Sequence, residues 1–194
     1  KIIPIIPKPV VIEKTKIDIE CDIKNIKDLL ELVEKYPIKC DVEYNINIQA
    51  LKNIKEPLKN LDSMVGMNEL KNSIVDQILY YIQDLNKCED FMHTVIYGPP
   101  GTGKTEIAKL MGKIFASLGI LKNKSFKKAT RADLIAGYLG QTALKTKQMI
   151  QSSLGGVLFI DEAYALGNNE RRDSFAKECI DTLCETLSDY KSEI

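Results

Sequence analysis

The chain has 194 residues, of which 44% are hydrophobic and 28% are charged. This composition is typical of a folded globular protein and excludes an intrinsically disordered chain. The 27 basic side chains balance the 27 acidic ones, and a net charge of zero argues against a nucleic-acid-binding or acidic-membrane-binding protein. The five cysteines form no C-x-x-C pair and there is one histidine, which argues against a structural zinc site. No apolar run approaches the ~20 residues of a membrane-spanning helix, so we expect a cytoplasmic protein with no membrane partner.

The first twelve residues, KIIPIIPKPVVI, are apolar but contain Pro4, Pro7 and Pro9. Proline removes a backbone donor and excludes a regular helix, so an extended segment is expected here. Because the chain begins with lysine, we expect a fragment or the ordered part of a longer protein.

Two segments near the start alternate apolar and polar residues, which is typical of half-buried strands. They are residues 17–23 and 40–50, and the apolar residues of 26–33 between them follow helical spacing. The pattern predicts a small β-α-β module, followed by a connection at 51–63. We therefore assign residues 1–60 to an accessory module with its linker, in which no residue indicates chemistry.

From residue 64 onward, amphipathic helices alternate with short apolar strands. The expected helices are residues 70–85, 107–118, 142–153 and 175–187, and the expected strands are residues 93–97, 125–130 and 157–160. Strands that alternate with helices of ten or more residues predict an α/β fold with a parallel sheet flanked by helices.

The stretch GPPGTGKT, residues 98–105, has the spacing of a phosphate-binding loop. Its glycines let backbone N–H groups approach a phosphate chain, and the helix that follows points its positive end at the same place. Lys104 supplies a full positive charge, and the Thr105 hydroxyl is a ligand for Mg²⁺. The alternative is a glycine- and proline-rich turn that matches by chance, but the flanking apolar strand and amphipathic helix favour the phosphate loop.

The stretch VLFIDE, residues 157–162, supplies two carboxylates, and Asp161 follows Lys104 by 57 residues. Four apolar residues bury the strand, so both carboxylates emerge at its carboxyl end, where open α/β sheets bind ligands. Asp161 is expected to bind Mg²⁺ through water, and Glu162 to orient and activate the attacking water. The alternative is that Asp161 and Glu162 are acidic residues on the surface without a role in chemistry. With the phosphate loop, the pair predicts an ATPase that uses ATP/ADP and Mg²⁺.

Three stretches together resemble the AAA+ ATPases of the CbbX/CfxQ type, and in particular the CfxQ-like proteins of large DNA viruses. They are GPPGTGKT, RADLIAGYLGQTALKTK and GGVLFIDEAYAL, and the resemblance extends from Leu61 to Asp189. It implies a P-loop NTPase fold in which residues 61–194 form the N-terminal part of the AAA+ large subdomain. That subdomain is expected to be incomplete at the C-terminus, because the family's sensor-1 residue, usual arginine finger and helical lid would follow Ile194.

The resemblance assigns roles to single residues. Nucleotide contacts are implied for Val65, Gly66, Pro99, Pro100, Gly101, Thr102, Gly103, Lys104, Thr105 and Glu106. Thr130 lies where the family keeps a polar residue that can hold the catalytic glutamate in an inactive pose, and it joins Lys104 and Glu162 as a catalytic residue. Arg171 and Arg172 resemble a subunit-interface pair, although solvated arginines at the start of a helix explain them equally well.

The stretch AGYLGQT, residues 136–142, places the aromatic Tyr138 between two glycines. The resemblance implies that this is the first pore loop, in which Tyr138 and Leu139 grip a polypeptide by apolar contact. The alternative is that Tyr138 packs locally against Leu134 or Leu139.

These observations predict a homohexameric ring ATPase that remodels or threads a polypeptide client, in the host cytoplasm or the virion if the protein is viral. The chain by itself is expected to turn over ATP weakly or not at all. One alternative is an ATP-gated nucleic-acid factor, such as a loader or helicase-like protein. The neutral charge counts against it, and the basic cluster at 122–128 is interpreted as a solvated loop. The other alternative is a binding module that uses nucleotide only for assembly. The presence of Glu162 argues against this alternative.

Overall fold

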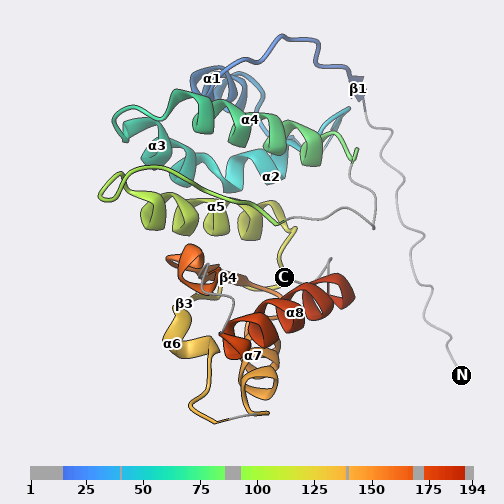
Figure 1. Cartoon of the computed structure of the whole chain (residues 1–194). Helices are drawn as coiled ribbons and strands as arrows, with labels where there is room; N and C mark the ends of the chain where they lie inside the picture. Colours follow the sequence, from blue (N-terminus) through green and yellow to red (C-terminus); the bar gives the residue numbers. More distant parts are fainter. Residues whose placement is uncertain (1–14, 40, 86–92, 139, 168–172, 191–194) are drawn as a thin grey trace, which may run out of the picture.

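The computed structural model describes residues 15–39, 41–85, 93–138, 140–167 and 173–190 (Figure 1). The elements of the N-terminal part are β1 (Thr15–Ile17), α1 (Ile26–Lys35), β2 (Val42–Tyr44), α2 (Ile48–Asn53), α3 (Lys55–Ser63), α4 (Asn68–Ile82) and α5 (Lys104–Leu118). Those that follow are β3 (Phe126–Ala129), α6 (Arg131–Leu134), α7 (Thr142–Gln151), β4 (Val157–Ile160), the 3-10 helix η1 (Ala163–Leu166) and α8 (Ser174–Asp189). The expected extended segment at residues 1–12 lies outside the described residues.

Helices α1 to α5 stack on one another in the upper half of Figure 1 and share one hydrophobic core. Its fully buried side chains include Leu29, Leu51, Leu58, Ile78 and Ile114. Residues from both sides of the expected boundary at 60/61 thus pack into the same core. The division into an accessory module and an ATPase part stays a prediction.

The expected β-α-β arrangement is present, but its strands are shorter than predicted. β1 and β2 pair in parallel from Thr15 opposite Val42 to Ile17 opposite Tyr44, so strands over the whole of 17–23 and 40–50 were wrong. Side-chain hydrogen bonds replace the ladder beyond Ile17. The backbone N–H of Ile19 donates to Asn45 Oδ1 at 3.0 Å, and Asn45 Nδ2 donates to the carbonyl of Ile19 at 3.3 Å.

The end of the second expected strand is a helix because Asn47 caps it. Asn47 Oδ1 accepts a hydrogen bond from the backbone N–H of Ala50 at 2.9 Å, which satisfies one of the free donors of the first turn of α2. The expected connection at 51–63 is the rest of α2 together with α3. Their apolar side chains recur at helical spacing and are buried in the first core.

β3 and β4 form the second parallel pair, which confirms the predicted α/β fold. The register runs from Phe126 opposite Val157 to Ala129 opposite Ile160. Helices α7 and α8 pack with this pair around a second core in the lower half of Figure 1, whose residues include Leu134, Ile150 and Cys179. The predicted helices at 70–85, 107–118, 142–153 and 175–187 are confirmed as α4, α5, α7 and α8, with small shifts of their ends.

The expected strand at 93–97 is not a strand in the structure. Val95 and Tyr97 are 87% and 92% exposed, and Ile96 packs against the first core. The two sheets of the described residues are β1–β2 and β3–β4. An apolar run marks a segment that can join a sheet, but a strand forms only where its backbone pairs with a neighbour. None of the helices in the described ranges is long and apolar enough to span a bilayer.

Candidate active site

The loop of residues 98–103 leads directly into α5, and its shape depends on glycine. Gly101 and Gly103 have φ angles of 76° and 82°, which residues with a Cβ atom rarely adopt. A Cβ atom built on Gly101 would meet no atom within 4 Å, so the space above this part of the loop is open. The loop thus has the backbone conformation and the free space that a phosphate group requires.

The ammonium group of Lys104 lies over this loop. Its Nζ donates to the carbonyl oxygens of Gly98 at 2.9 Å and Pro99 at 2.7 Å. Thr102 Oγ1 donates to the same Pro99 carbonyl at 2.9 Å. These bonds close the loop around the ammonium group and place its positive charge at the N-terminus of α5, where Thr105 is half-buried in the first turn.

Helix α5 lies close against β4 because Gly112 has no side chain. A Cβ atom built on Gly112 would lie 2.9 Å from Val157 Cγ2 and 3.8 Å from the ring of Phe126. Side chains alternate along a strand, so Val157, Phe159 and Asp161 share this face of β4. Lys104 lies eight residues before Gly112, about 12 Å along the helix, and its charge acts on the Asp161 carboxyl at the carboxyl end of β4.

Asp161, at that end of β4, forms an ion pair with Lys128 of β3. Lys128 Nζ lies 2.7 Å from Asp161 Oδ2, and the backbone N–H of Glu162 donates to Oδ1 at 3.1 Å. The hydrogen bond from Lys128 holds the pKa of the Asp161 carboxyl below its usual range, and the charge of Lys104 lowers it further. The carboxylate is therefore ionised at neutral pH, as a metal ligand must be.

These residues fit a magnesium ion. Mg²⁺ prefers oxygen ligands and keeps several of its waters, so one hydroxyl and one carboxylate at the mouth of a phosphate loop are a suitable donor set. Thr105 and Asp161 would hold it between α5 and β4. The roles of both residues remain predictions.

Glu162 is exposed and has φ and ψ angles of 52° and 43°. A residue other than glycine in this left-handed conformation is uncommon, and such backbone strain gathers at functional sites. Glu162 directly follows Asp161 and is the N-cap residue of η1. This position supports its predicted role as the general base.

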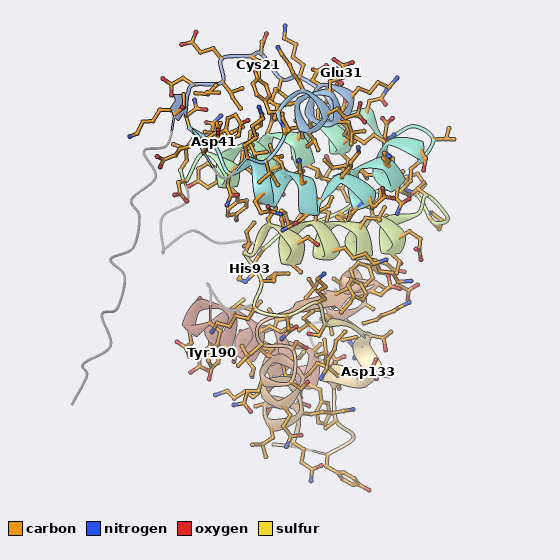
Figure 2. All side chains as sticks on the ribbon, turned by 180° about the vertical axis from the view of Figure 1, so that it is seen from behind. Cys21, Glu31, Asp41, His93, Asp133 and Tyr190 are labelled. Carbon is orange, nitrogen blue, oxygen red and sulfur yellow. The ribbon has the colours of Figure 1, made fainter. Side chains whose placement is uncertain are left out.

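Thr130 caps the short helix α6. Its hydroxyl donates to Asp133 Oδ2 at 2.7 Å, and its backbone N–H donates to the same oxygen at 2.8 Å (Asp133 is labelled in Figure 2). The hydrogen bond from the Thr130 hydroxyl holds the pKa of the Asp133 carboxyl below its usual range, and the bond from the Thr130 backbone N–H contributes to the same shift. The hydroxyl proton of Thr130 is thus engaged in a cap, and its role as a switch for Glu162 stays a prediction.

The segment 64–67, expected to contact adenine, lies beside the phosphate loop. A Cβ atom built on Gly103 would lie 3.3 Å from Met64 Cε, and Lys71 Nζ donates to the Met64 carbonyl at 2.6 Å. Val65 is 96% exposed next to this contact. The structure therefore brings the segment to the loop and leaves an apolar side chain open to solvent there.

The roles of Glu106, Leu139, Arg171 and Arg172 also stay predictions. Glu106 pairs with Lys109 at 2.8 Å on the exposed face of α5, and this contact lowers the pKa of its carboxyl. Leu139, Arg171 and Arg172 lie outside the described residues.

The loop between α6 and α7 has a fixed base. Lys145 Nζ donates to the carbonyls of Ala132 at 2.6 Å and Ile135 at 2.9 Å. The buried hydroxyl of Thr146 donates to the carbonyl of Leu134 at 3.1 Å. These bonds satisfy carbonyls at the end of α6 and fix the point at which the loop leaves the fold.

The tip of the same loop is open to solvent. Tyr138 is 74% exposed, whereas Leu134 at the base is fully buried. This difference favours an exposed tyrosine over one that packs on Leu134, and it matches a residue that contacts something outside the chain.

Lys128 and Arg131 were not among the predicted site residues. The Arg131 guanidinium donates to the carbonyl of Ala165 at 2.7 Å and forms an ion pair with Asp173, so it joins α6 to η1 and to the start of α8. The interpretation of 122–128 as a solvated loop was wrong for Lys128, which lies in β3. The alternation in SFKKAT could have indicated that Lys128 shares a face with Phe126.

The family described as ATPase family associated with various cellular activities (AAA) matches residues 94–194, just over half of the chain. The chain belongs to this AAA family. It is similar to a cfxQ-like protein of Acanthamoeba polyphaga mimivirus, with 38% identity over 167 residues that cover 85% of this chain and 41% of the relative. The resemblance to the CfxQ type is thereby confirmed.

Two further relatives of this AAA chain come from bacteria. Stage V sporulation protein K of Bacillus subtilis is 40% identical over 147 residues, which cover 72% of this chain and 45% of the relative. The ESX-3 secretion system protein EccA3 of Mycobacterium leprae is 35% identical over 148 residues, which cover 73% and 23%. The chain spans less than half of the length of each of the three relatives.

Proposed function

We propose that this chain binds ATP with Mg²⁺ and belongs to a machine that hydrolyses ATP to ADP and phosphate. The observation that supports this most directly is the placement of Lys104 and Asp161. One begins α5, the other follows β4, α5 packs closely on β4 at Gly112, and the charge of Lys104 acts on the Asp161 carboxyl.

Each residue of the site then has a defined task. The backbone N–H groups of residues 101–105 and the Lys104 ammonium bind the phosphates of ATP, while Thr105 and Asp161 hold the metal. When bound, Mg²⁺ neutralises charge on the phosphates and orients them. Glu162 accepts a proton from the attacking water, whose oxygen bonds to the terminal phosphorus as the bond to the leaving ADP oxygen breaks.

The proposal extends to assembly and client. We propose a homohexameric ring of the cytoplasm that threads or remodels a polypeptide, with Tyr138 and Leu139 in the pore and Arg171 and Arg172 at the subunit interface. The exposure of Tyr138 on a loop with a fixed base supports this. The names of two relatives, a sporulation protein and a secretion system protein, do not identify the client.

Replacement of Lys104 with alanine tests the nucleotide site. One unit charge pair at ~4 Å and an effective dielectric of ~20 is worth about 4 kcal/mol, so loss of the ammonium should lower the affinity for ATP about a hundredfold or more. Isothermal titration calorimetry of ATP with Mg²⁺ measures this. Lys109→Ala is the matched control, because it removes a lysine from the exposed face of the same helix. Equal affinities of the parent and Lys104→Ala would exclude the assignment.

A further inference from the structure

We propose that Lys128 is an internal cation of the magnesium site, which holds Asp161 in the nucleotide-free chain and is displaced when Mg²⁺ arrives with the nucleotide. Lys128 would then set how strongly Mg²⁺ increases the affinity for nucleotide. The inference rests on the proposed function, because it concerns the same site.

The register of the sheet fixes this contact. Lys128 lies opposite Phe159, so Asp161 lies two residues further along the neighbouring strand and on the same face. The backbone N–H of Asp161 donates to the carbonyl of Ala129 at 2.8 Å, which continues the ladder past β4 and holds the Asp161 backbone in place. The 2.7 Å ion pair is thus a result of strand pairing and does not depend on a flexible loop.

Both carboxylate oxygens of Asp161 are engaged. Oδ2 accepts from the Lys128 ammonium, and Oδ1 accepts from the backbone N–H of Glu162. A hydrated Mg²⁺ must donate its hydrogen bonds to these same oxygens, and the divalent ion and the ammonium repel one another at this distance. The two cations therefore compete for one carboxylate.

Lys128 can move away from Asp161 when the metal ion binds. The Lys128 side chain is 49% exposed, so its ammonium can leave Asp161 for solvent when the metal binds. The Lys104 ammonium donates to the carbonyls of Gly98 and Pro99, so Lys128 is the cation in contact with Asp161.

The variants Lys128→Met and Lys127→Met together separate competition for Asp161 from a general effect of positive charge on nucleotide binding. Removal of the Lys128 ammonium frees the Asp161 carboxylate, so the ratio of the ADP dissociation constant in EDTA to that in Mg²⁺ should rise about two- to fivefold, as expected for a half-exposed ion pair. Lys127→Met is the matched control. It removes the same charge from the neighbouring residue of β3, whose side chain points to the other face of the sheet.

The experiment is a calorimetric titration of ADP into the parent and both variants, with Mg²⁺ or with EDTA. ADP is used because it is not consumed. A rise in the ratio for Lys128→Met, with a parental ratio for Lys127→Met, supports the inference. An unchanged ratio for Lys128→Met, or an equal rise in both variants, overturns it.

Two further outcomes are distinguishable. If the parent binds no ADP under either condition, the proposed function fails and the inference falls with it. If the parent binds ADP and Mg²⁺ strengthens the binding, but Lys128→Met does not change the ratio, the inference alone fails. Should thermal melting show that Lys128→Met is unfolded, Lys128→Gln provides the same measurement with a polar side chain, and Lys128→Arg should keep the parental ratio.

Discussion

Replacement of Gly112 with alanine tests the packing of α5 on β4. Alanine in a helix interior is worth about 1 kcal/mol more than glycine. The new Cβ atom, however, would lie 2.9 Å from Val157 Cγ2, and valine cannot move a methyl group cheaply because its side chain is stiff. Overpacking of this kind costs about 1–3 kcal/mol, so the free energy of unfolding should fall by up to about 2 kcal/mol. Urea unfolding followed by circular dichroism measures it.

A double-mutant cycle separates the contact from the helix propensity. Val157→Ala removes the opposing methyl groups, so the double variant keeps the gain in helix propensity without the clash. We expect a coupling energy of about 1–3 kcal/mol. Lys113→Ala, on the exposed side of α5, should be close to neutral. The packing of α5 on β4 would be refuted if Gly112→Ala raised the free energy of unfolding by the full ~1 kcal/mol and if the effects of Gly112→Ala and Val157→Ala were additive.

Two more predictions concern the chemistry and the loop. Glu162→Gln keeps the shape of the side chain but removes the proton acceptor. The variant should therefore bind ATP as the parent does, and in the full-length protein it should hydrolyse ATP about 10²–10⁴-fold more slowly. Parental turnover of Glu162→Gln in a coupled ATPase assay would exclude Glu162 as the base. Because Tyr138 is largely exposed, Tyr138→Ala should leave the melting temperature and ATP binding unchanged but abolish stimulation of the ATPase by an unfolded polypeptide. A large drop in melting temperature, or unchanged stimulation, would contradict the pore-loop assignment.

The residues of the candidate nucleotide site could be selected from the sequence because their determinants are local. The glycines of residues 98–103 act on their own backbone, and Asp161 follows a run of four apolar residues that has the length of a strand and forms β4. The Lys128–Asp161 pair was not predictable in the same way. It depends on the register between β3 and β4, and a shift by one residue would turn Lys128 to the other face.

The N-terminal strands show why alternation alone overestimates strand length. The pattern of residues 40–50 fits a strand throughout, but Asn45 bonds the backbone of Ile19 and Asn47 caps α2. A short amide side chain can replace a ladder bond or start a helix, and which of these occurs depends on a neighbour that the local pattern does not contain. For the apolar segment 93–97, the composition is typical of a strand, but the sequence does not show whether a neighbouring strand is available to pair with it.

The bonds around Arg131 connect η1 to the base of the loop that carries Tyr138. Glu162 begins η1, and the carbonyl of Ala165 within η1 accepts from the Arg131 guanidinium. Arg131 is the first residue of α6, whose last carbonyls are held by Lys145 at the base of the loop that carries Tyr138. The same set of hydrogen bonds therefore runs from η1 through α6 to the base of the loop whose tip exposes Tyr138.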